Sequence, residues 1–187
     1  MTLLIERTYS MLPPTSFTTS RLLLRAPLSA DAVAIFQAYA QDPEVTRYLV
    51  WRPHRDLTET QAFIERCLLS WQQQTEFAYV ITDQQTTQLL GMLSLRISGS
   101  GASLGYGLRR DAWGQGIMPE AAGVVTDWAL AQPSIYRVWA ICDYENRASA
   151  RVLEKIGMHC EGLMRRGVVH PNISDEPRDC WLYAKVK

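Results

Sequence analysis

Apolar and polar residues alternate through the middle of the chain and then change their spacing at a pair of glycines. Leu104, Tyr106 and Leu108 alternate with smaller or polar residues, which is the period of a pleated strand. After Gly116 the apolar residues recur at helical spacing, at Ile117, Ala121, Val124, Val125 and Trp128. Residues 104–120 are therefore predicted to form a strand, a glycine-bearing turn and the first turn of a helix.

The same two periods assign elements to the rest of the chain. Before this stretch they predict an irregular lead-in at 1–19, a strand at 21–27, a helix capped by Ser29 that stops at Asp42-Pro43, a loop at 43–57, a helix at 57–74 capped by Thr58, and a hairpin of strands at 77–82 and 88–97. After it they predict that the helix ends near Gln132, followed by a strand at 136–142, a helix capped by Asn146 that ends at Gly157, and strands at 159–169 and 178–186. This order indicates an α+β or α/β plan, with helices on the faces of a mixed sheet.

The turn between the central strand and its helix could hold a phosphate group. The first N–H groups of a helix have no partner, and the positive end of the helix dipole lies there. Glycines such as Gly114 and Gly116 let a phosphate approach the backbone closely. The same glycines would also suit a plain strand-to-helix turn, because the pattern lacks a third glycine and a Walker-type lysine.

A second polar pair lies at the start of the last predicted helix. Asn146 and Ser149 are three residues apart, so both can face the same side of its first turn. Each also has a local explanation, since asparagine is a good N-cap and a serine hydroxyl can bond back to a backbone carbonyl.

The composition fits one domain and excludes several classes of function. The chain has 187 residues, 47% of them apolar, and its 19 Lys and Arg balance its 19 Asp and Glu, so we expect no nucleic-acid or membrane partner. The apolar runs are short and residues 1–5 do not resemble a signal peptide, which favours a cytoplasmic protein, monomeric or homodimeric. Four cysteines and three histidines show no ligand spacing, so we expect no metal site.

Taken together, these motifs resemble the GCN5-related N-acetyltransferase (GNAT) superfamily, and more narrowly its branch of ribosomal-protein N-terminal acetyltransferases. The likeness runs from about Thr19 to Tyr183 and is carried by TSRLLLR, DPEVTRYLVW, DAWGQGIMPEA, NRASARVLEKIGM, EGLMR and RDCWLYA. The resemblance implies one GNAT domain at 20–187, with a mixed, mostly antiparallel sheet of about seven strands flanked by about four helices.

The resemblance also implies an acetyl-CoA site. By matching position, the backbone of Leu108 and Arg109 would meet the pantetheine arm, and the backbone of the turn would hold the phosphates, at Trp113, Gly114, Gln115, Gly116, Ile117 and Met118. Met118 departs from the small residue usual in its slot and could crowd the phosphates. Asn146 and Ser149 would lie near the thioester. The family's tyrosine slot holds Leu153, so Ser149 is the expected proton donor to the leaving thiolate.

A general base is harder to identify, and this bears on the acceptor. The family's usual carboxylate position holds Ser103, although a water chain to Glu76 or Asp143 could serve instead. At pH 7 a lysine amine costs roughly 4–5 kcal/mol to deprotonate, whereas an α-amine costs about 1 kcal/mol. The expected acceptor is therefore a protein or peptide N-terminus. Tyr48, Trp51 and Glu76 are the candidate residues that face it, with packing of the loop as the other explanation for the two aromatic residues.

Two other functions fit the same motifs. The acceptor could be a small amine such as a polyamine, an amino sugar or an antibiotic, or the protein could bind acyl-CoA without turnover. Arg165, Arg166 and Arg178 could meet an acidic substrate or the CoA phosphates, or they could be solvated strand charges.

Overall fold

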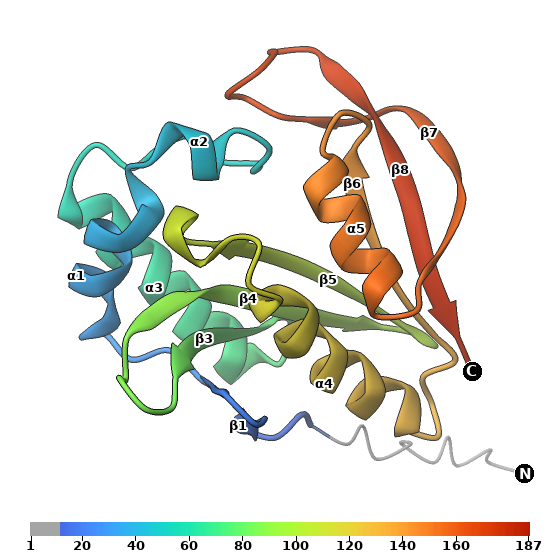
Figure 1. Ribbon diagram of the computed structural model, residues 1–187, viewed down its shortest axis with the longest axis horizontal. Coiled ribbons are helices and arrows are strands. Elements are labelled where there is room, and N and C mark those ends of the chain that lie inside the picture. Colours follow the sequence, from blue (N-terminus) through green and yellow to red (C-terminus); the bar gives the residue numbers. More distant parts are fainter. Residues whose placement is uncertain (1–11) are drawn as a thin grey trace, which may run out of the picture.

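The computed structural model describes residues 12–187, so the first part of the predicted lead-in, residues 1–11, lies outside the described residues. One eight-stranded sheet runs through the molecule in the order β1-β2-β3-β4-β5-β6-β8-β7 (Figure 1). Its strands are β1 (Ser16–Thr18), β2 (Leu22–Arg25), β3 (Phe77–Asp83), β4 (Leu89–Ser98), β5 (Gly101–Leu108), β6 (Arg137–Asp143), β7 (His159–Val169) and β8 (Pro177–Val186). All neighbouring strands are antiparallel except β5 and β6, which are parallel.

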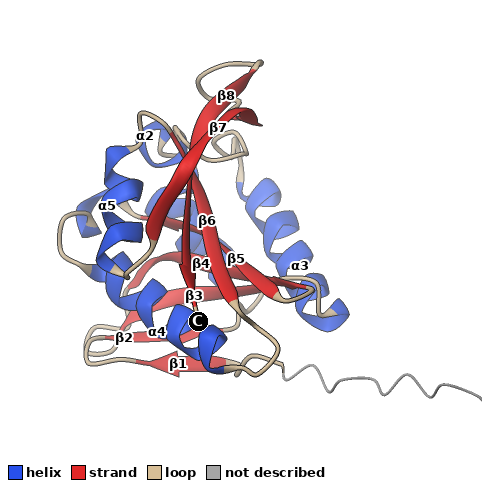
Figure 2. Cartoon of the chain, turned by 90° about the vertical axis from the view of Figure 1, so that its right-hand side faces the viewer, coloured by secondary structure: helices blue, strands red, loops and turns tan. Residues whose placement is uncertain are grey.

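Helices cover the sheet on both faces. They are α1 (Asp31–Ile35), continued by a π-helical turn at Phe36–Ala40, α2 (Pro43–Thr46), α3 (Leu57–Gln73), α4 (Ile117–Ala131) and α5 (Arg147–Lys155). Figure 2 shows α4 and α5 on one side of the sheet and α3 on the other. Side chains along β3 point alternately to the two faces of the sheet. Phe77, Tyr79 and Ile81 pack under α4, while Ala78 and Val80 pack under α1 and α3. Within residues 12–187, no helix is long and apolar enough to cross a bilayer.

The two parallel strands separate along their length. β5 and β6 are hydrogen-bonded at three residue pairs, from Gly101–Arg137 to Ser103–Trp139, and the register then ends. Beyond Ser103 the strands diverge toward their carboxyl ends, at Leu108 and Asp143, and leave a wedge in the middle of the sheet (Figure 1). Open α/β sheets bind ligands at the carboxyl ends of such parallel strands.

The predicted mixed sheet and helix order are confirmed, with one more strand and one more helix than expected. Residues 16–18, placed in the irregular lead-in, form β1 because Phe17 points inward and packs against Tyr79, with ring centroids 5.3 Å apart. The predicted loop at 43–57 contains α2, because Asp42 caps it by accepting from the Glu44 N–H, and proline suits the first helical position.

Two predicted caps are wrong. Ala30, not Ser29, occupies the N-cap of α1, and nearby Asp31 instead accepts the Leu28 N–H and pairs with Arg25. α3 is capped by Asp56, whose carboxylate accepts the Glu59 N–H at 3.1 Å, rather than by Thr58. Neighbouring serine, threonine and aspartate residues are all good caps, so the sequence alone does not choose between them.

Candidate active site

Beyond its pairing with β6, the strand β5 has backbone N–H and C=O groups that point into the wedge. Arg109 donates its N–H to the Leu90 carbonyl on β4 at 2.8 Å, and its own carbonyl accepts from Ala112. Successive strand residues point their backbone groups in opposite directions, so those of Leu108 face the wedge. The Leu108 carbonyl accepts the indole N–H of Trp113 at 2.8 Å. The Leu108 backbone thus points into the wedge, while both backbone groups of Arg109 are paired within the protein, so the expected contact of these two residues with a pantetheine arm stays a prediction.

The turn after β5 contains a run of backbone N–H groups without a hydrogen-bond partner among the described residues. Gly114 and Gly116 both have φ of 74°, a left-handed conformation that glycine adopts without strain. In residues 12–187 no well-formed hydrogen bond is made by five consecutive N–H groups, those of Gly114, Gln115, Gly116, Ile117 and Met118. Such a run at the start of a 15-residue helix has the arrangement that binds anions at helix N-termini in general, which makes the turn a candidate phosphate site. The Met118 side chain is buried in the core, so it does not crowd this site.

An arginine from the other edge of the sheet holds this turn. Arg21 donates to the Gln115 carbonyl at 3.1 Å and forms an ion pair with Glu120 of α4 at 2.6 Å. Arg21 therefore fixes the turn from beneath and adds positive charge beside it. Nothing local in the sequence points to Arg21, because its pair with Glu120 spans 99 positions of the chain.

Two hydroxyl groups meet across the wedge. Asn146 caps α5 as expected, accepting the Ser149 N–H at 3.1 Å, and this cap uses its amide oxygen. The Ser149 hydroxyl lies 2.8 Å from the hydroxyl of Tyr106, which reaches it from β5. Burial raises the pKa of Tyr106, so its hydroxyl stays protonated near neutral pH. Burial also raises the pKa of the adjacent Cys142 thiol to about 12.

On the opposite face, a loop covers the end of β5. The Leu49 Cδ1 atom lies 3.8 Å from the position that a Cβ on Gly107 would take. Tyr48 packs its ring edge-on against His170, with centroids 6.5 Å apart, so it lies between the ends of β5 and β6. Trp51 instead stacks on His54 and Phe63, at 4.8 and 6.2 Å, which is the packing explanation for this residue.

Glu76 does not join these residues. Its carboxylate forms an ion pair with Arg96 at 2.9 Å. Arg96 lies four residues along β4 from Met92, the partner of Gly107, so about 13 Å of strand separates Glu76 from Leu49. Glu76 therefore lies at the closed end of the wedge, away from Leu49, and its contact with a substrate stays a prediction.

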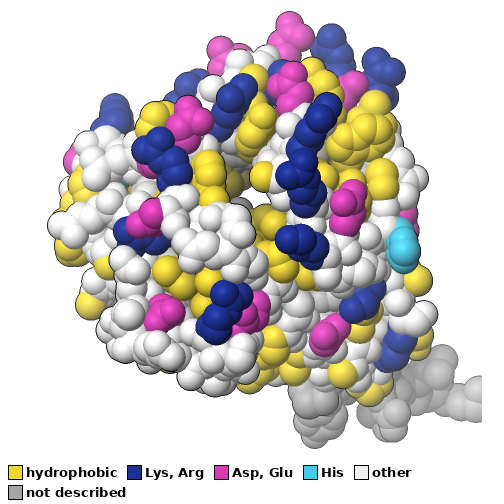
Figure 3. All heavy atoms as spheres, viewed as in Figure 1, with side chains coloured by type: hydrophobic (Ala, Val, Ile, Leu, Met, Phe, Trp, Pro, Cys, Tyr) yellow, Lys and Arg dark blue, Asp and Glu magenta, His cyan; other side chains and the backbone are white. Residues whose placement is uncertain are grey.

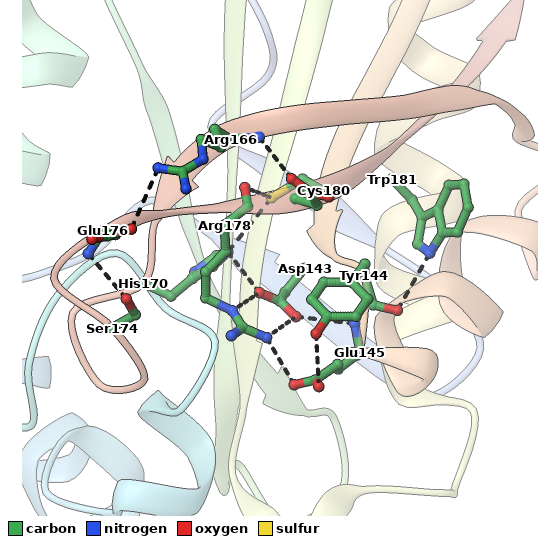
Figure 4. A network of polar contacts seen from close by, with 11 residues as sticks. Asp143, Tyr144, Glu145, Arg166, His170, Ser174, Glu176, Arg178, Cys180 and Trp181 are labelled. Carbon is green, nitrogen blue, oxygen red and sulfur yellow. Dashed lines mark hydrogen bonds and ion pairs between the residues drawn. The ribbon is translucent and has the colours of Figure 1, made fainter.

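A buried ion pair closes the end of β6 (Figure 4). Asp143 has no exposed side-chain surface and accepts from Arg178 at 2.6 and 3.2 Å, and Arg178 also reaches Glu145 at 2.8 Å. Burial would raise the pKa of Asp143, but the hydrogen bonds from Arg178 outweigh it and lower that pKa below its usual value. His170 Nε2 lies 3.7 Å from the Asp143 carboxylate, and burial lowers the pKa of His170. Both groups thus keep their neutral-pH charge states, Asp143 ionised and His170 neutral.

The other arginines of these strands are also paired. Arg165 meets Asp179 at 2.9 Å, and Arg166 meets Glu176 at 3.3 Å. Arg178 is thus held in a buried ion pair, whereas Arg165 and Arg166 are solvent-exposed charges with carboxylate neighbours.

A row of basic side chains that was not among the predicted site residues follows α5. Arg147, Arg151 and Lys155 are exposed and four residues apart, so they share one side of the helix. Among the described residues none of the three has a carboxylate within 4.0 Å. Figure 3 shows Lys and Arg side chains on the α5 side of a hollow with hydrophobic groups around it. The i, i+4, i+8 spacing would have been enough to predict this row.

No metal centre accompanies these groups in the part of the chain that the structure describes. Within residues 12–187 there is no cluster of three or more His, Cys, Asp or Glu residues that could hold a metal ion.

Comparisons with known proteins find relatives of this chain in sequence and in fold. The model of the acetyltransferase (GNAT) domain family matches residues 21–159. The N-acetyltransferase YoaA of Bacillus subtilis (strain 168), itself uncharacterised, is 27% identical over 172 residues, which cover 90% of this chain and 95% of YoaA.

Two solved structures share the fold over more than nine-tenths of this chain. The microcin C7 self immunity acetyltransferase MccE, in complex with acetyl-CoA and AMP, matches with a TM-score of 0.84 at 20% identity, covering 94% of this chain and 98% of that one. The ribosomal L7/L12 alpha-N-protein acetyltransferase RimL, in complex with coenzyme A, matches with a TM-score of 0.80 at 24% identity, covering 92% and 96%.

Proposed function

This chain belongs to the acetyltransferase (GNAT) domain family, and we propose that its acceptor is the α-amino group of a protein or peptide N-terminus. The protein is an N-acetyltransferase that uses acetyl-CoA as its acetyl donor, as its family and the name of its relative YoaA indicate. The similarity to RimL, whose name describes an alpha-N-protein acetyltransferase, supports an N-terminal acceptor.

The observation that carries this proposal is that the carboxylates around the wedge are already paired. The pairs are Asp42 with Arg110, Glu76 with Arg96, and Asp143 and Glu145 with Arg178. A carboxylate held ionised by arginine, like Asp143 with its lowered pKa, is a weak base. It cannot readily deprotonate a lysine amine near pKa 10.4, whereas an α-amine near pKa 8 is already partly free at neutral pH.

The remaining chemistry follows from the two faces of the wedge. The uncharged amine attacks the thioester carbonyl carbon from the Tyr48 side, the C–S bond breaks on the Ser149 side, and the extra proton on the nitrogen is lost to solvent as the coenzyme A thiolate leaves. Ser149 donates a hydrogen bond to the departing thiolate, and Tyr106 holds the serine hydroxyl in place. The free N–H groups after Gly114 hold the pyrophosphate. Positioning the two substrates together can supply roughly 7–11 kcal/mol toward the barrier.

A small amine is the second candidate acceptor. The observation that supports it is the similarity to MccE, a self immunity acetyltransferase whose solved structure holds a small molecule, AMP, together with acetyl-CoA. Both candidates use the same donor site, so only the acceptor side distinguishes them.

Release of free thiol from acetyl-CoA against a panel of amines tests the proposal. The panel contains peptides with Ala, Ser or Thr at a free N-terminus, lysine peptides with a blocked N-terminus, spermidine and an aminoglycoside. We expect the highest kcat/KM with the free N-termini. Turnover restricted to spermidine or the aminoglycoside would transfer the function to the small-amine candidate.

A further inference from the structure

Two loops that are far apart in the sequence form a roof over the open end of the wedge. The first, here called the arch, comprises residues 46–51 and follows α2. The second joins β7 to β8 at residues 170–176. Figures 1 and 2 both show α2 beside the β7–β8 turn. The arch carries Leu49 over Gly107, as described above, so its position sets the clearance above β5.

One side chain joins the second loop to both ends of the arch. The amide nitrogen of Asn172 donates to the Thr46 carbonyl at 2.6 Å and to the Trp51 carbonyl at 2.8 Å. A primary amide carries two hydrogens on one nitrogen, so a single group fixes the separation of the two ends. Aspartate has the same shape but, when ionised, has no hydrogen to donate.

The neighbouring contacts are weaker or hold other parts of the roof. Arg52 and Asp175 form an ion pair at 3.2 Å between the same two loops, but their side chains are 65% and 93% exposed, and such pairs contribute little. The ion pair of Asp42 with Arg110 anchors the start of α2, ahead of the arch. Asn172 is thus the contact that acts on both ends of the arch at once.

The same loop connects the arch to the thioester side. His170, two residues before Asn172, packs on Tyr48 and lies against Asp143. The Asp143 carbonyl accepts the N–H of Asn146, the cap of α5, at 2.8 Å. The loop therefore spans the mouth of the wedge from the arch to the helix that carries Ser149.

We propose that Asn172 is a positioning residue for the acceptor amine. By holding the ends of the arch together, it sets the height of Tyr48 and Leu49 over Gly107 and thus the opening through which the amine reaches the thioester. This inference rests on the proposed function, because it takes the arch to be the acceptor wall.

Steady-state kinetics of two variants tests it. Asn172→Asp removes both donated hydrogens without changing the shape and places carboxylate oxygens against two carbonyls. We expect it to raise the KM for the acceptor about tenfold, as loss of such hydrogen bonds implies, with the KM for acetyl-CoA within about twofold of wild type. Asn172→Gln keeps both donated hydrogens, so its acceptor KM should lie much closer to that of wild type than the KM of Asn172→Asp does. Arg52→Ala is the matched control, since it removes the exposed ion pair between the same loops, and it should behave as wild type.

The outcomes separate this inference from the proposed function. All variants are assayed with the amine that wild type turns over fastest, so a wrong acceptor class shows in the wild type alone. An acceptor KM that stays within about twofold in Asn172→Asp would overturn the positioning role. A parallel rise of the acetyl-CoA KM would also overturn it, because general loosening of the fold affects both substrates.

Discussion

At the scale of single residues, the contact between the hydroxyl groups of Ser149 and Tyr106 links the two sides of the wedge. One hydroxyl comes from the first turn of α5 and the other from β5, at 2.8 Å. Ser149 could be proposed from its sequence motif, but Tyr106 could not, because it reads as one of several apolar residues on a strand. Only the divergence of β5 from β6 turns it toward Ser149.

Ser149→Ala should lower kcat by about 10²–10⁴-fold, the usual contribution of a positioned proton donor. Tyr106→Phe should cost less, since Ser149 keeps its own hydrogen. Both KM values for acetyl-CoA should stay near wild type, because the phosphates are held elsewhere. Thiol release at saturating substrate measures the effect. A Ser149→Ala enzyme with wild-type kcat would remove Ser149 from the mechanism.

His170 predicts how stability depends on pH. Burial lowers its pKa in the folded state below the unfolded value of about 6.5, so the unfolded chain binds the extra proton first. Its contribution to stability is present above that value and is lost as pH falls below it. The facing groups keep their charge over this range, since Asp143 and Arg178 are paired and burial raises the pKa of the Cys180 thiol to about 11.

Thermal melts between pH 7.5 and 5 measure this dependence. The slope for one group is at most about 1.4 kcal/mol per pH unit. His170→Gln should flatten the fall in Tm, while His159→Gln, at an exposed position, should leave the wild-type slope. An unchanged slope in His170→Gln would show that His170 does not carry the effect. His54, whose pKa burial also lowers, should account for part of what remains.

At the scale of elements, local signals predicted the turn and most element types but not every cap, and long-range contacts could not be predicted. The glycine turn, the Asn146 cap and the period of β5 all depend on residues within a few positions of one another, and they formed as predicted. Nothing local in the sequence reveals the ion pair of Glu76 with Arg96. Arg21 and Asn172 were missed for the same reason, since each acts on a segment about a hundred residues away.

Gly116→Ala tests the turn as an element. A non-glycine residue at φ of 74° costs about 1–2 kcal/mol, and the new methyl would lie 3.6 Å from the Arg21 guanidinium. We expect a lower Tm and a higher KM for acetyl-CoA. Gly99→Ala is the matched control, because Gly99 has φ of 56°, has no atom within 4 Å of a new Cβ, and lies at the closed end of the wedge.

Both variants should therefore lose stability, but only Gly116→Ala should bind acetyl-CoA less tightly. Isothermal titration with acetyl-CoA and thermal melts on the same samples measure the two effects. Equal affinities for the two variants would argue against the free N–H groups of this turn as the phosphate site.

At the scale of the whole molecule, the two faces of the wedge carry different sets of groups. The face proposed to bind the donor carries the turn, the hydroxyl pair and the basic row of α5. The face proposed to admit the acceptor carries the arch and the loop that braces it. The mixed sheet could be predicted from element order and from the resemblance to the acetyltransferase family. The roof could not, because it depends on two loops with no periodic pattern meeting across the end of the sheet.

The most direct test of the N-terminal acceptor uses one peptide that carries both a free α-amine and an internal lysine. At pH 7 the uncharged fraction of the α-amine exceeds that of lysine by roughly two orders of magnitude. After reaction with acetyl-CoA, tandem mass spectrometry locates the acetyl group on one nitrogen or the other. A site whose carboxylates are all paired should acetylate the α-nitrogen almost exclusively. Acetylation of the lysine at a comparable rate would contradict the account, since it would require a base that these residues do not provide.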